Sequence, residues 1–95
     1  MNIHYDALAE YGLHGRLAKL RTEATEVANK IDRYDEGKAT LVEVVLEIWD
    51  FLFVLVSITK SHEYRKAERE ASSSRHNRKS EMKLRKAIND RRTPQ

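Results

Sequence analysis

Residues 41–58 read LVEVVLEIWDFLFVLVSI, and this stretch decides the fold of the chain. Only Glu43, Glu47, Asp50 and Ser57 interrupt its apolar character. A strand would place Glu43, Glu47 or both on an apolar face, whereas a helix groups the acidic residues on one side. Thr40 is a suitable N-cap, and Glu43 three residues later completes a capping box. The stretch therefore predicts a core helix that starts after Thr40.

This helix is too polar to cross a membrane. Its longest uninterrupted apolar run covers residues 51–56, whereas a transmembrane helix needs about 20 apolar residues. Residues 1–16, MNIHYDALAEYGLHGR, lack the basic region and apolar run of a secretory signal. The chain contains no cysteine, which excludes disulfides and thiolate chemistry. We expect a cytoplasmic protein without a membrane partner.

Other helices are expected on both sides of this stretch. A short helix over residues 5–12 should end at Gly12, and a longer one should follow it until Asp35, Glu36 and Gly37. A polar helix is expected over residues 59–71, a loop or frayed helix end at 72–74 and a thin amphipathic helix over 75–92. The fold class is all-α, with one domain over residues 1–95. The stripe expected to face a partner helix contains Leu13, Leu17, Leu20, Ala24, Val27, Ile31 and Tyr34.

The core helix is apolar on more than one side, so it should be covered from two directions. One arc contains Leu41, Val44, Val45, Ile48, Leu52 and Leu55, and another contains Leu46, Trp49, Phe53 and Val56.

Two acidic pairs carry the strongest functional signal. Glu23 and Glu26 are three residues apart, as are Glu47 and Asp50, so each pair shares one face of its helix. Carboxylates beside a core are costly unless a cation compensates them. Four carboxylates from two packed helices offer the hard oxygen ligands that Mg²⁺ prefers, with Mn²⁺ as the alternative ion. Glu43 extends the acidic stripe as an outer ligand.

Charge divides the chain into two halves. Residues 1–59 have a net charge of −4 and residues 60–95 a net charge of +7, which gives the overall +3. A basic segment is typical of proteins that bind nucleic acid, an acidic membrane surface or a polyphosphate. The histidines lack metal-binding spacing and are interpreted as surface residues: His4, His14, His62 and His76.

Residues 21–55, RTEATEVANKIDRYDEGKATLVEVVLEIWDFLFVL, resemble the MazG-like all-α nucleoside triphosphate pyrophosphohydrolases. That family has E-x-x-E on one helix and E-x-x-D on the next. The resemblance makes Glu23, Glu26, Glu47 and Asp50 the magnesium ligands and catalytic residues. It implies hydrolysis of a nucleoside triphosphate to the monophosphate and pyrophosphate. It also implies a homodimer or tetramer, in which helices from two subunits form a four-helix bundle.

In such proteins the C-terminal helix often contributes Lys, Arg or Asn to triphosphate binding. The residues at matching helical spacing in this chain are Lys79, Lys83, Lys86 and Asn89.

Two alternatives remain open from the sequence. One is a helical dimer without catalytic activity that binds nucleic acid or a protein partner through residues 60–95. The other is a dimer that keeps the pyrophosphohydrolase fold but not its activity. Two departures from the family leave this open: Thr22 stands where the family often has a second glutamate, and the aromatic cluster of Trp49, Phe51 and Phe53 is bulkier than the usual aliphatic residues.

Overall fold

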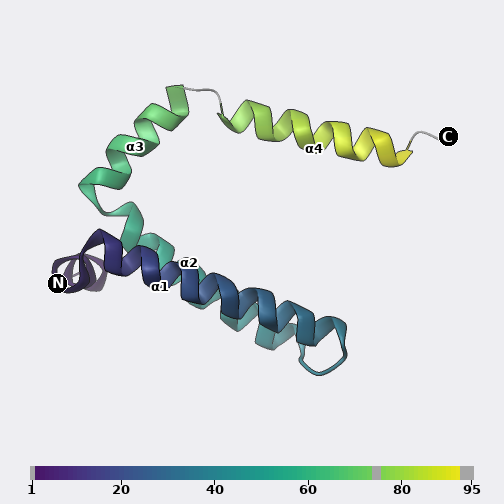
Figure 1. The fold of residues 1–95 in the computed structure, drawn as a ribbon, viewed down its shortest axis with the longest axis horizontal. Coiled ribbons are helices and arrows are strands. Elements are labelled where there is room, and N and C mark those ends of the chain that lie inside the picture. Colours follow the sequence, from purple (N-terminus) through teal and green to yellow (C-terminus); the bar gives the residue numbers. More distant parts are fainter. Residues whose placement is uncertain (1, 74–75, 93–95) are drawn as a thin grey trace. The chain divides into compact units, whose positions relative to one another are not determined.

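The computed structural model describes residues 2–73 and 76–92, and these residues form four α-helices and no strand (Figure 1). The prediction of an all-α fold is confirmed. The helices are α1 (Ile3–Asp35), α2 (Leu41–Thr59), α3 (His62–Ser73) and α4 (His76–Arg92). Of the predicted loop or frayed end, Ser72 and Ser73 form the end of α3, and Ser74 lies outside the described residues.

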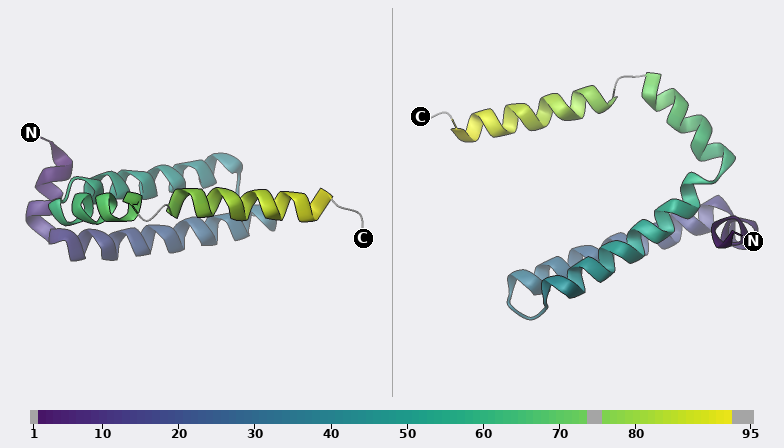
Figure 2. Two further views of the ribbon diagram at one scale, coloured as in Figure 1. Left: turned by 90° about the horizontal axis from the view of Figure 1, so that it is seen from above. Right: turned by 180° about the vertical axis from the view of Figure 1, so that it is seen from behind.

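Gly12 divides α1 into two helical parts. Its backbone has φ 71° and ψ 174°, a conformation that residues other than glycine essentially never adopt. The residues before Gly12 therefore turn away from the axis of the longer part (Figure 2). The expected short helix is present, although it begins at Ile3 and not at Tyr5. The side chain of Asn2 caps its start by accepting a hydrogen bond from the His4 amide at 2.9 Å.

The longer part of α1 and α2 form an antiparallel helical hairpin (Figures 1 and 2). Gly37, at φ 76°, ends α1 in a Schellman motif: its amide donates to the Tyr34 carbonyl at 3.0 Å, and the Lys38 amide donates to the Arg33 carbonyl at 2.8 Å. The predicted capping box is confirmed. The Glu43 amide donates to Thr40 Oγ1 at 3.2 Å, and the Thr40 amide donates to Glu43 Oε2 at 3.1 Å.

The interior of this hairpin is thin and partly polar. Among the described residues, the buried apolar side chains are Val44, Val54 and Ile58. Glu23 and Ser57 are buried with them. The contact between α1 and α2 therefore buries a carboxylate of α1 and a hydroxyl group of α2 as well as aliphatic side chains.

The predicted apolar face of α1 was wrong in part. On α1, Leu17, Ile31 and Tyr34 are exposed, whereas Glu23 is buried. The contact with α2 is made along a neighbouring line of α1 that includes Glu23, so the predicted stripe lies to one side of it. Residues of both predicted arcs of α2 are exposed in the single chain, and these are Leu41, Leu46, Ile48, Trp49, Leu52, Phe53 and Val56. Val42, outside both arcs, is exposed as well. Coverage of α2 from a second direction stays a prediction.

The chain separates into two compact units, residues 1–64 and 65–95. The second unit contains α4, whose Glu81 and Arg85 form an ion pair with 2.7 Å between Oε1 and Nη2. Met82, Leu84 and Ile88 on this helix are exposed. A single domain over the whole chain stays a prediction. Within the described residues, no helix is both long and apolar enough to span a lipid bilayer.

Candidate metal centre

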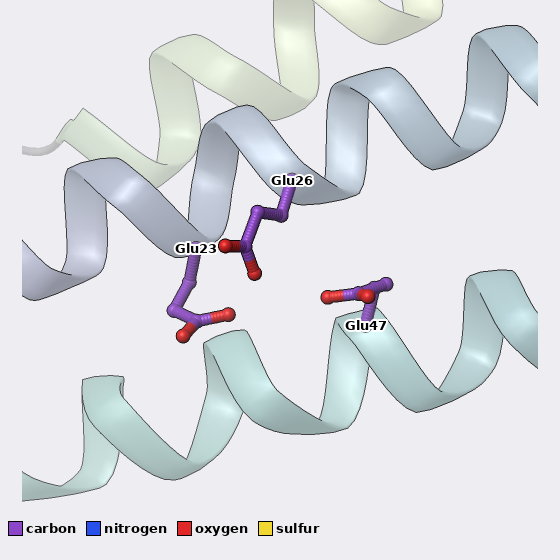
Figure 3. A group of neighbouring side chains, drawn as sticks. All are labelled: Glu23, Glu26 and Glu47. Atoms are coloured by element: carbon purple, nitrogen blue, oxygen red, sulfur yellow. The ribbon is translucent and has the colours of Figure 1, made fainter.

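Three carboxylates converge between the two helices of the hairpin (Figure 3). Glu23 and Glu26 extend from α1 and Glu47 from α2. Three oxygens, one from each carboxylate, all lie within 4.8 Å of one another. Glu23 is buried, with only 6% of its surface exposed, whereas Glu47 is half-buried and Glu26 is exposed. The group is therefore closed at Glu23 and open to solvent at Glu26.

Two oxygens of this group have no protein partner. Glu23 Oε1 lies 3.0 Å from the Lys19 ammonium. Glu23 Oε2 and Glu47 Oε2 are buried and accept no hydrogen bond. A buried carboxylate oxygen without a donor is costly, and such oxygens usually have a hydrogen-bond donor or a cation beside them. The three carboxylates could therefore hold a metal ion through hard oxygen ligands from two helices.

The carboxylates also change one another's protonation. A hydrogen bond with Glu23, followed by the repulsion from the charge of Glu23, raises the pKa of Glu26. Glu23 also raises the pKa of Lys19, through its hydrogen bond and then its negative charge. For a lysine, a raised pKa means that the charged form is stabilised. Lys19 is therefore positively charged at neutral pH.

The raised pKa of Glu26 predicts a pH-dependent stability in the metal-free protein. Between 4.5, the ordinary pKa of this carboxyl, and its raised value, the folded chain binds more protons than the unfolded chain. The contribution of Glu26 to the free energy of unfolding is therefore complete below pH 4.5 and lost as the pH rises through the raised pKa. Urea denaturation at several pH values should show a smaller loss of stability with rising pH in Glu26→Gln than in wild type. Glu10→Gln, an exposed control on α1, should keep the wild-type profile, and an unchanged profile in Glu26→Gln would contradict the prediction.

The structure brings together three of the four predicted ligands. Asp50 lies three residues after Glu47 on α2, is exposed, and is not one of the three clustered residues. Its role as a ligand stays a prediction. The residues predicted to bind the triphosphate lie on α4 in the second unit, where Lys79, Lys83 and Lys86 line a shallow hollow with Ser80 and Met82. Asn89 is exposed farther along the same helix.

A second polar group lies at the kinked end of the hairpin. Ser57 Oγ is fully buried and lies 2.8 Å from His4 Nδ1 and 3.4 Å from Arg16 Nη2. The interpretation of His4 as a surface histidine was wrong, since its ring is half-buried and packs against Phe53 with 4.8 Å between ring centroids. Arg16 Nε is buried and has no hydrogen-bond partner.

The sequence contains only an indirect signal for this group. Ser57 interrupts the apolar stretch, and Gly12 permits the turn that carries His4 back to it, but neither residue identifies the other. A direct signal was present for Lys19, which is four residues before Glu23 and can pair with it on one helix.

Comparisons with protein-family models, with curated proteins and with solved structures found no significant match to the chain.

Proposed function

We propose that this protein is a magnesium-dependent nucleoside triphosphate pyrophosphohydrolase of the MazG-like type. The observation that supports this most is the group of Glu23, Glu26 and Glu47, in which two buried carboxylate oxygens have no protein partner. Such an arrangement is unfavourable in the isolated chain and becomes favourable when a hard cation binds. The E-x-x-E and E-x-x-D spacing adds the resemblance to a family that uses carboxylates in this way.

Each side chain has a separate role in this proposal. Glu23 and Glu47, which are the less exposed, would hold the metal through their unpartnered oxygens. A bound magnesium ion would polarise the phosphoryl oxygens and lower the pKa of water. Glu26 is exposed and has a raised pKa, so its carboxylate can orient the attacking water and accept a proton from it. The water oxygen bonds to the α-phosphorus, and the bond to the bridging oxygen breaks to release pyrophosphate.

The proposal includes assembly with a second copy of the chain. Trp49 and Phe53 on α2 are 62% and 53% exposed, and they belong to a larger apolar face. Uncovered apolar surface of this extent usually marks an interface in a protein chain. Two hairpins joined through α2 would form a four-helix bundle, in which each copy covers the same face of the other.

The proposed activity can be tested directly. Purified protein is incubated with common and deoxynucleoside triphosphates, with and without magnesium, and pyrophosphate release is measured. We expect release that requires the metal. Absence of release from every nucleotide, together with tight nucleic-acid binding at physiological salt, would contradict the enzyme.

One observation favours a second candidate, a nucleic-acid-binding protein. Lys79, Lys83 and Lys86 lie together on one part of α4 and are exposed. A face of this kind can bind a phosphate backbone with strong salt dependence. Residues 65–95 contain no phenylalanine, tryptophan or tyrosine, so base stacking has no support there.

A further inference from the structure

Cationic side chains border the acidic group on α1. Arg16 and Lys19 line a shallow groove together with Tyr11, Gly15, Ala18 and Thr22. Lys19 also binds Glu23 Oε1, with 3.0 Å between nitrogen and oxygen. The groove and the carboxylates are therefore in contact through a shared side chain.

Two glycines give this groove its form. Gly12 breaks the helix directly after Tyr11. A Cβ atom on Gly15 would lie only 2.9 Å from the Cβ of Tyr11, so Tyr11 can occupy its position only because Gly15 has no side chain. Tyr11 is 65% exposed and forms one border of the groove.

Arg16 is fixed in position, but its hydrogen bonds are incomplete. Its Nη2 donates to the buried Ser57 Oγ at 3.4 Å, and this hydroxyl is also in contact with His4 at 2.8 Å. Its Nε is buried without an acceptor. A guanidinium donor without an acceptor is unfavourable, and phosphate oxygens match the planar geometry of that group. Lys19 adds a second positive charge on a half-exposed side chain.

We propose that the groove lined by Arg16 and Lys19 binds the diphosphate group that becomes pyrophosphate. The inference rests on the proposed function, because it places the leaving group beside the carboxylates that would hold the metal. Arg16 would donate to one phosphate from its guanidinium group, and Lys19 would neutralise charge between that phosphate and Glu23. The groove lies in the same unit as the carboxylates, unlike the lysines of α4.

The test measures binding of inorganic pyrophosphate by calorimetry, first without metal and then with magnesium. Arg16→Gln and Lys19→Gln should each weaken this binding at least about tenfold, the loss expected for one charge-assisted hydrogen bond. Arg21→Gln removes an equal charge from the same helix at an exposed position outside the groove, and should change the affinity less than twofold. Equal losses in all three variants would show a general charge effect and overturn the groove.

Further arms separate the possible outcomes. A nucleoside diphosphate should show the same dependence on Arg16 and Lys19, whereas a nucleoside monophosphate should not; equal dependence for the monophosphate would refute a diphosphate site. Lys19→Gln keeps the proposal testable if Arg16→Gln does not fold, because Lys19 is half-exposed. If magnesium raises the melting temperature but pyrophosphate does not bind, the proposed groove is refuted and the proposed metal site is not. Pyrophosphate binding that depends on Arg16 and Lys19, without any magnesium response, would support the groove and refute the proposed function.

Discussion

Glu47→Gln is expected to remove most of the magnesium-induced rise in melting temperature and to abolish pyrophosphate release. The substitution keeps the side-chain volume but removes a negative charge and one of the two unpartnered buried oxygens of the candidate site. Free magnesium at about 100 times its Kd stabilises a folded protein by about 2.7 kcal/mol. For a domain of this size that corresponds to a Tm rise of roughly 10 to 20 °C in the wild type.

The melting temperature without metal shows whether Glu47→Gln acts on the site and not on the fold. Removing one of three neighbouring negative charges relieves repulsion, so the metal-free variant should be at least as stable as the wild type. Turnover should fall by at least about 100-fold, since even the loss of a residue that only orients a metal ligand can cost that much.

Glu10→Gln is the matched control, because Glu10 is an exposed glutamate on α1 outside the three-residue group. It should retain both the magnesium response and activity. Similar behaviour of the two variants would rule out the metal centre. Asp50→Asn forms a separate arm: lost activity would include Asp50 in the working site, and full activity would limit the site to the three clustered carboxylates.

Leu52→Glu is expected to convert a dimer into monomers. Leu52 is 45% exposed and belongs to the uncovered apolar face of α2. In a symmetric dimer the substitution acts twice, since each copy contributes the same face. Burying a leucine contributes about 1.5 to 3 kcal/mol, and a buried unpaired carboxylate adds a further cost. The dissociation constant of the dimer should rise by more than about 100-fold.

Sedimentation equilibrium at micromolar concentration measures this change. Leu84→Glu is the control, because Leu84 is 62% exposed on α4 and receives the identical substitution. It should leave the assembly dimeric. A wild-type chain that is fully helical and monomeric at this concentration would contradict the two-copy bundle.

The sequence predicts the helices well because their ends have local causes. Thr40 and Glu43 identify the start of α2 through a capping box, and Gly37 identifies the end of α1 through its positive φ. The acidic pairs also lie on the helices where they were expected, and three of their four members meet. All these features depend on residues close together in the chain.

The packed faces depend on contacts between distant residues, and here the sequence was less informative. Leu17 and Ile31 satisfy a helical stripe yet lie exposed, because the contact with α2 is made along a neighbouring line that includes Glu23. The pairing of His4 with Ser57 depends on how far the chain turns at Gly12. No local sequence pattern predicts the angle between the two parts of α1 at Gly12.

The thin interior of the hairpin has a consequence for how its stability is defined. With Val44, Val54 and Ile58 as its buried apolar side chains among the described residues, the hairpin gains little from its own core. If a second copy and a cation supply the rest, the folded fraction becomes a function of the solution as much as of the sequence. Each tenfold dilution of the chain would then lower the free energy of unfolding by about 1.4 kcal per mole of dimer. The abundance of the chain in its surroundings would itself control how much of it is folded.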